Sequence, residues 1–357
     1  MPLTSAEILE DPIDNYPEAT VACFDATCGE LPRRQLDESR TIEYLERLSL
    51  AGAKAALIAS STGQGHLRTV AELEAWFRCA ARAETQGMLL FGLLRPEDGI
   101  AANYHLLDVL AELNYPVVFF RPGNNLPENA SDMQVSDSLA PLVEAAAARH
   151  LAVGLYSISD ISGLPLTPEA AAPLIDAPGG DHIVSIKVTE TDYSKSTALF
   201  LTHPALRHLK IVQGWDPHLE QALRDGSMHD EEGRQRVGIT SGLMALAIYQ
   251  YLHILQLARK CDWEKVRAVQ LTTTALFEAM QDDPQHFADL QRAKYIMGLG
   301  HPLTDTVLDE QAERVLQILE DLPESEDRKR LARSLDLMSD GPYHKFFLRL
   351  IESGNNQ

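Results

Sequence analysis

From about residue 19 onward, short apolar runs alternate with longer amphipathic stretches, and this alternation limits the fold more than any other feature of the chain. The apolar runs lie at 20–26, 54–60, 88–94, 116–122, 151–158, 182–189, 209–215 and 236–242. Amphipathic stretches with helical spacing separate them, among them 37–52, 69–87 and 103–114. Such alternation predicts parallel strands joined by helical crossovers.

Eight such units over roughly 220 residues fit a (β/α)8 TIM barrel, whose usual size is about 250 residues. A doubly wound nucleotide-binding sheet is the alternative, and it requires a glycine-rich turn after the first strand. Here the first strand leads into FDATCGELP, without GxGxxG, and GxxxxGK[ST] occurs nowhere in the chain. We therefore predict an α/β barrel over residues 1–245.

After residue 242 the apolar runs stop and helical spacing continues toward the C-terminus. Three long stretches carry it, at 243–260, 262–281 and 283–300. Prolines interrupt the region at Pro302, Pro323 and Pro342. We predict an all-helical C-terminal region, residues 246–357, packed on the barrel.

The charge and composition of the chain limit the classes of partner that it can bind. The formal net charge is −21, which repels nucleic acid and anionic membrane surfaces, and we find no basic patch. No stretch reaches the roughly 18 uninterrupted apolar residues of a membrane span. The four cysteines form no CxxC pair, and the histidines lack ligand spacing. We expect a cytoplasmic protein with reduced thiols, no metal, no cofactor, and no nucleic-acid or membrane partner.

In a TIM barrel the active site lies at the carboxyl ends of the strands. Lys187 stands near the end of the sixth predicted strand, in the run HIVSIKVTET. Two interpretations remain open from this strand alone. The lysine either faces the helices and extends to solvent, or it points into the barrel, where lost hydration lowers its pKa and makes the amine a nucleophile.

Two neighbouring strands end in residues that suit the second interpretation. The second strand runs into Ser-Ser-Thr-Gly, where Ser61 and Thr62 present hydroxyls and backbone N–H groups to a carboxylate. The fifth strand carries Tyr156, whose phenol can relay protons to an amine on the sixth. Each also has a structural interpretation, the first as an ordinary strand-to-helix turn and the second as a barrel-lining aromatic.

Taken together, SSTGQG, LYSISDISGLPLTPE, SIKVTE, QGWD and GITSG resemble motifs of the dihydrodipicolinate synthase / N-acetylneuraminate lyase family of class I aldolases. The order and spacing match over about residues 19–300, nearly the whole chain. The family pattern has a GTTGE-like turn after strand two, a tyrosine after strand five and an Ile-Lys strand. The resemblance implies a homodimer or homotetramer.

The resemblance also implies roles for individual residues. Lys187 would condense with the ketone of a 2-oxo acid such as pyruvate, and Tyr156 would shuttle protons during imine formation and carbon–carbon bond chemistry. Ser61 and Thr62 would hold the carboxylate of the oxo acid. Gly214 and Thr240 would line the substrate pocket near the ends of strands seven and eight.

The chain departs from the synthases at three places. Gln64 replaces the glutamate of the strand-two motif. Arg-Pro-Gly-Asn-Asn at 121–125 replaces a Pro-Tyr-Tyr that supplies a relay tyrosine, and Ile161 replaces an arginine that binds the aldehyde's carboxylate. These differences disfavour lysine biosynthesis and favour a longer or less anionic aldehyde, such as a sugar-derived one. Arg95 or Arg121 is either a substitute cation or part of the scaffold.

We therefore expect a Schiff-base lyase or aldolase that acts on a 2-oxo acid and an aldehyde or sugar-acid partner. Two alternatives stay open. One is a barrel that binds an oxo acid or sugar acid with little or no turnover, because a proton-relay residue is missing. The other keeps the imine but dehydrates or decarboxylates a deoxy sugar acid.

Overall fold

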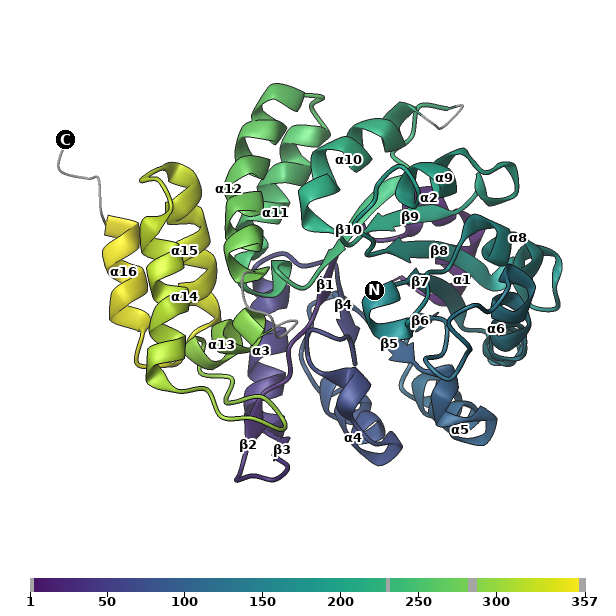
Figure 1. Ribbon diagram of the computed structural model, residues 1–357, viewed down its shortest axis with the longest axis horizontal. Helices are drawn as coiled ribbons and strands as arrows, with labels where there is room; N and C mark the ends of the chain where they lie inside the picture. The colour runs from purple at the N-terminus through teal and green to yellow at the C-terminus, as the bar shows by residue number, and fades with distance from the viewer. Residues whose placement is uncertain (1–2, 229–231, 282–287, 353–357) are drawn as a thin grey trace.

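Eight parallel strands close into a barrel in the computed structural model, which describes residues 3–228, 232–281 and 288–352 (Figure 1). Around the barrel the order is β1-β10-β9-β8-β7-β6-β5-β4, so neighbours in space are neighbours in the strand sequence. The strands are β1 (Ala19–Ala22), β4 (Ala55–Ile58), β5 (Leu89–Leu94), β6 (Val117–Phe120), β7 (Ala152–Ser157), β8 (Ile183–Val188), β9 (Lys210–Gln213) and β10 (Val237–Ser241). The predicted (β/α)8 TIM barrel is confirmed.

Helices follow the strands and cover the outside of the barrel, as the amphipathic spacing of the intervening stretches predicts. They are α3 (Glu38–Leu50), α4 (Val70–Ala80), α5 (Ile100–Glu112), α6 (Asp132–Ala147), α8 (Pro168–Asp176), α9 (Thr197–Thr202), α10 (Leu219–Met228) and α11 (Met244–Ala258). The short α7 (Ser159–Ser162) belongs to the loop between β7 and α8. A small antiparallel pair, β2 (Thr27–Cys28) and β3 (Gln35–Leu36), lies between β1 and α3 in the chain.

Alternation along each strand separates two apolar layers, because successive side chains point to opposite faces. One layer fills the barrel and includes Phe91, Phe119 and Tyr156. The other lies between strands and helices and includes Ile186 and Val188 of β8. Lys187, between these two residues, therefore points into the barrel.

The strands are shorter than their apolar runs predict, and the difference matters at β1. This strand ends at Ala22, and the next residues form a loop in which the Cys23 amide still donates to the Leu57 carbonyl. Asp25, which falls within the apolar run at 20–26, lies in this loop and is fully buried. At the opposite end of the barrel, α1 (Ser5–Glu10) and α2 (Pro12–Asn15) precede β1, and α1 contacts β7 and β8.

The region beyond β10 is helical, as predicted. After α11 it comprises α12 (Trp263–Gln281), α13 (Ala288–Ile296), α14 (Asp309–Asp321), α15 (Glu326–Met338) and α16 (His344–Glu352). Figure 1 shows α14, α15 and α16 as a layer beside the barrel, and α15 packs on α11 and α3. Part of the helix expected at 283–300 falls outside the described residues. Within the described part of the chain, no helix has the length and apolar character needed to cross a bilayer.

Candidate active site

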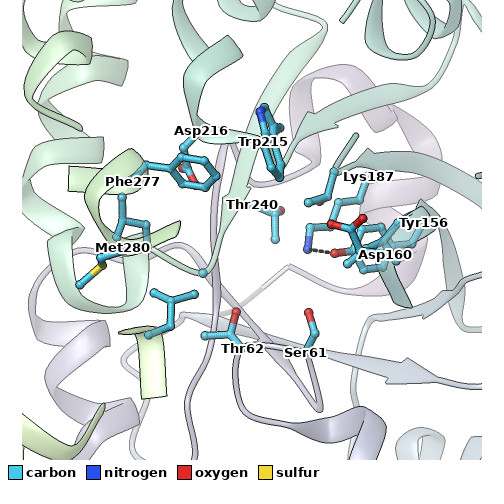
Figure 2. Close-up of a pocket in the computed structure, with 16 residues that line it drawn as sticks. Ser61, Thr62, Tyr156, Asp160, Lys187, Trp215, Asp216, Thr240, Phe277 and Met280 are labelled. Carbon is cyan, nitrogen blue, oxygen red and sulfur yellow. Dashed lines mark hydrogen bonds between the residues drawn. The ribbon is translucent and has the colours of Figure 1, made fainter. Parts of the chain in front are cut away.

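Lys187 and Tyr156 lie side by side inside the barrel, near the carboxyl ends of β8 and β7 (Figure 2). The two strands are in a register that places residue 156 opposite residue 187. The Lys187 Nζ donates a hydrogen bond of 2.8 Å to the Tyr156 phenol oxygen and lies 4.0 Å from the centre of the ring. The backbone register alone thus brings the amine and the phenol together.

Burial changes the protonation of both groups. Lys187 is only 3% exposed, and the loss of hydration lowers its pKa to about 7, while the nearby Asp216 carboxylate opposes part of this shift. Burial raises the pKa of Tyr156, so the phenol keeps its proton at neutral pH. A partly neutral amine beside a protonated phenol is suited to attack on a carbonyl with proton transfer. The solvent-facing interpretation of Lys187 is wrong.

The loop after β4 folds back tightly beneath this pair. Ala59 has a positive φ of 65°, and the Gly65 amide donates to the Ser60 carbonyl. A Cβ at Gly63 would lie 2.3 Å from the Trp76 ring, and one at Gly65 would lie 1.9 Å from the Ala59 carbonyl oxygen. The turn therefore requires its glycines, and it presents Ser61 and Thr62 to the pocket.

Glycines also make room at the ends of β9 and β10. A Cβ on Gly214 would meet the Thr189 hydroxyl at 2.1 Å and Lys187 Cε at 3.2 Å. A Cβ on Gly242 would meet the Thr62 hydroxyl at 2.4 Å. Within the described part of the chain, the buried Thr240 Oγ1 has no hydrogen-bond partner. It is a polar atom available to a bound molecule.

All six residues proposed from the sequence line one pocket at the carboxyl end of the barrel. They are Ser61, Thr62, Tyr156, Lys187, Gly214 and Thr240. The structure brings them together, and their roles in binding or catalysis remain predictions.

The sequence interpretation missed an apolar part of the pocket wall. It is formed by Ile158, Trp215, Leu243, Phe277, Met280 and Leu290. Phe277 and Met280 lie on α12 and Leu290 on α13, far along the chain from the barrel strands. Helical spacing marks them as members of an apolar helix face, but nothing in the sequence shows that this face covers the mouth of the barrel.

Asp216 also lines the pocket and is almost completely buried. It accepts a short hydrogen bond from the Tyr251 hydroxyl, which in turn accepts one of 3.2 Å from Ser241 Oγ. Burial nevertheless raises the pKa of Asp216 to about 6. The sequence places Asp216 at a strand end, but Tyr251 on α11 gives no signal of its part in this network.

Arg95 and Arg121 belong to the scaffold. Arg95 pairs with Asp98 at 2.7 Å and donates to backbone carbonyls of the loop after β4. Arg121 pairs closely with Glu97. Neither guanidinium lines the pocket, and Ile161 packs against the apolar interior of the barrel. Neither Arg95 nor Arg121 therefore supplies the positive charge of the arginine that the synthases carry at the position of Ile161.

A buried polar contact joins the C-terminal helices to the pocket loops. Gln291 of α13 donates a hydrogen bond of 2.7 Å to the Thr62 carbonyl. One turn further, Lys294 donates to Asp25 at 2.9 Å, and Arg68 binds the other oxygen of the same carboxylate. Asp25 is therefore an anchor for α13, outside the pocket lining. Within the described ranges, no three His, Cys, Asp or Glu side chains gather in a group that could hold a metal ion.

Solved structures with the same architecture were found despite very low sequence identity. YagE from E. coli K12, a prophage protein of the dihydrodipicolinic acid synthase family in complex with pyruvate, is 17% identical with a TM-score of 0.72. The match covers 86% of this chain and 98% of YagE. This chain has the fold of the dihydrodipicolinate synthase / N-acetylneuraminate lyase family. The resemblance inferred from the sequence motifs is confirmed at the level of the fold.

Two further solved structures with this fold are an N-acetylneuraminate lyase and a sialic acid aldolase. N-acetylneuraminate lyase from Fusobacterium nucleatum is 14% identical, with a TM-score of 0.69 and coverage of 86% of this chain and 98% of that one. A catalytic lysine mutant of the Ruminococcus gnavus sialic acid aldolase is 12% identical, with a TM-score of 0.69 and coverage of 89% and 96%. No family model and no curated protein matches the sequence itself.

Proposed function

We propose that this protein is a Schiff-base lyase or aldolase, in which Lys187 forms an imine with a 2-oxo acid of the pyruvate type. The observation that carries the proposal is the buried amine of Lys187, whose pKa is lowered to about 7, 2.8 Å from the Tyr156 phenol in a pocket. The pyruvate complex of YagE and the catalytic lysine of the Ruminococcus aldolase support it by analogy of fold.

Each side chain has a defined part in this chemistry. The neutral Lys187 amine attacks the ketone carbon, and Tyr156 gives a proton to the departing hydroxyl, so that water leaves and an iminium forms. The turn at Ser61 and Thr62 holds the carboxylate of the oxo acid, and the Thr240 hydroxyl offers a further hydrogen bond. In condensation the carbon next to the iminium loses a proton to give an enamine, which attacks the aldehyde carbon while the aldehyde oxygen takes up a proton. In cleavage these steps run in reverse, and the electrons of the broken carbon–carbon bond form the enamine.

Reductive trapping tests the proposal directly. The protein is incubated with pyruvate and borohydride, digested, and each lysine-containing peptide is weighed by mass spectrometry. We expect a carboxyethyl increment on Lys187 alone. Lys210 is a matched internal control, because it is also buried, with a pKa lowered to about 8, yet it lies at the other end of the barrel. An unmodified Lys187 with pyruvate and other 2-oxo acids contradicts the proposal.

A binding protein with little or no turnover is the second candidate. The observation that favours it is the ion pair between Arg121 and Glu97, which occupies the end of β6 where the synthases carry a relay tyrosine. In this case trapping succeeds, but no aldehyde is consumed or released. Assays of aldol condensation and of aldol cleavage, with protein that trapping shows to form the imine, distinguish the lyase from the binding protein.

A further inference from the structure

The candidate active site has two chemically different halves (Figure 2). The hydroxyls of Ser61 and Thr189 lie close to the Tyr156 phenol, and Thr62 and Thr240 line the same pocket. These groups suffice to bind the ketone and the carboxylate of a small oxo acid. The opposite wall, toward Phe277 and Met280, is then the surface left for the aldehyde substrate.

That opposite wall is aromatic and apolar. The Trp215 ring meets Phe277 edge to face, with 4.9 Å between the ring centres. Met280 and Leu290 are buried and line the pocket with this pair, as does Leu243, two residues after β10. Such a surface stabilises an aromatic or bulky apolar group by dispersion and by release of water.

The charged groups that line the pocket disfavour an anionic partner. Among the lining residues that the structure describes, Lys187 is the only cation, and it is committed to the ketone. Asp160 and Asp216 also line the pocket, so its other charged lining groups are carboxylates, whereas a second substrate carboxylate needs a guanidinium. Arg95 and Arg121 are held by Asp98 and Glu97.

A partner rich in hydroxyls also fits poorly. A sugar-derived aldehyde brings several hydroxyls that lose water on entering the pocket, and each requires a hydrogen-bond partner there. Trp215, Phe277, Met280 and Leu290 offer no acceptor, apart from the indole N–H as a donor. Asp216 is already engaged by Tyr251, and Asp160 lies on the side of Tyr156, away from Phe277 and Met280 (Figure 2). An unpaired buried hydroxyl is costly, so the wall discriminates against polyols.

The geometry points to an uncharged aldehyde with an aromatic or bulky apolar group as the second substrate, seated against Trp215 and Phe277. This inference rests on the proposed imine at Lys187. The iminium of the oxo acid loses a proton from its methyl carbon to give an enamine, and that carbon forms a bond to the aldehyde carbon. The aldehyde oxygen takes up a proton and becomes a hydroxyl. Water then hydrolyses the iminium, which releases a 4-hydroxy-2-oxo acid and restores the amine.

A panel of aldehydes tests this substrate class. The full-length protein is assayed with pyruvate and benzaldehyde, glyceraldehyde or succinic semialdehyde, and products are measured by mass spectrometry. The reverse reaction is assayed by release of pyruvate from 4-hydroxy-2-oxo-4-phenylbutanoate. We expect kcat/KM for benzaldehyde to exceed that for either polar aldehyde by about tenfold or more.

Variants connect the preference to the wall. Rates are normalised to the fraction of protein that pyruvate and borohydride modify at Lys187. On this basis Phe277→Ser should lower kcat/KM for benzaldehyde by roughly ten- to a hundredfold, and Phe277→Leu should lower it less. Phe346→Ser is the matched control, because Phe346 is a half-buried aromatic on α16, away from the pocket.

The outcomes separate the two proposals. If Lys187 is trapped but the polar aldehydes are preferred, or no aldehyde reacts in either direction, the inferred substrate class is wrong and the imine stands. The same holds if Phe277→Ser leaves the preference for benzaldehyde unchanged. If Lys187 is not trapped by any 2-oxo acid, both the proposed function and the inferred substrate class are overturned.

Discussion

The amine of Lys187 and the phenol of Tyr156 face each other across one strand pairing, with 2.8 Å between Nζ and the phenol oxygen. The contact needs no loop to form it, since both residues lie within strands, and a register shift between Val153 and Gly154 sets residue 156 opposite residue 187. Burial inside the barrel removes water from the Lys187 amine, and this loss of hydration is the largest cause of its lowered pKa. Reactivity in this pocket should therefore follow the protonation of Lys187.

The rate of imine formation should rise with pH around a midpoint near 7. The pKa of Lys187 is lowered to about 7, so the ammonium, which has no lone pair, predominates below this pH and the neutral amine above it. Trapping by cyanoborohydride at saturating pyruvate, followed across the pH range, measures the midpoint. A midpoint close to that of an ordinary lysine, roughly 10.4, would show that burial does not tune this amine.

Removal of the Tyr156 hydroxyl should reduce turnover far more than binding. Tyr156→Phe keeps the ring beside Lys187 but deletes the proton donor, and positioned acid–base groups typically contribute about 10²- to 10⁴-fold. We expect kcat to fall within this range while KM for pyruvate changes only a few-fold. Tyr115→Phe is the control, because that hydroxyl is also buried but donates to the Phe77 carbonyl. Equal losses in both variants would contradict a specific role for Tyr156.

The barrel was predictable because its information is local. Each apolar run and each amphipathic stretch identifies one strand or helix without reference to the rest of the chain. The same pattern places Tyr156 and Lys187 on neighbouring strands, since consecutive strands are neighbours in a barrel. Their direct opposition also depends on the register shift between Val153 and Gly154, which the pattern does not show. The strand boundaries were less predictable: the run at 20–26 continues past Ala22, where the chain leaves the sheet although its side chains stay buried.

The remainder of the site depends on long-range packing. Phe277 and Leu290 reach the pocket only because α12 and α13 lie over the carboxyl end of the barrel, and helical spacing does not specify which surface a helix covers. Arg95 and Arg121 illustrate the reverse case. Their partners, Asp98 and Glu97, lie in the short stretch Arg-Pro-Glu-Asp after β5, but only the fold shows that Glu97 reaches a guanidinium on the next strand.

Replacement of Lys187 by methionine should stabilise the protein, most strongly at low pH. The unfolded lysine keeps its proton up to about pH 10, whereas the folded pKa is about 7, so the unfolded state binds more protons between these values. Wild-type stability therefore rises with pH across this window. Below it, the buried ammonium costs on the order of 4 kcal/mol, which Lys187→Met removes.

Urea unfolding of both proteins measures this effect. The stability gap between Lys187→Met and wild type should be largest near about pH 6 and should shrink toward about pH 10. Lys195→Met is the control, because that side chain is 82% exposed and its surface pairing with Asp192 contributes little. A gap that is independent of pH would indicate a packing effect of methionine, unrelated to the charge of Lys187.

Gln291 should act as a positioning residue for the oxo-acid site. Its side-chain amide donates a hydrogen bond of 2.7 Å to the Thr62 carbonyl, which ties the turn after β4 to α13. Gln291→Leu leaves this carbonyl without its partner, and small displacements of substrate-positioning groups are costly. We expect KM for pyruvate to rise by about tenfold, whereas the pH midpoint of imine formation stays near that of wild type. Gln317→Leu is the control, since Gln317 donates to Asp321 within α14, outside the pocket lining. A shifted pH midpoint, or an equal rise in KM for both variants, would show that Gln291 does not act through the turn at Thr62.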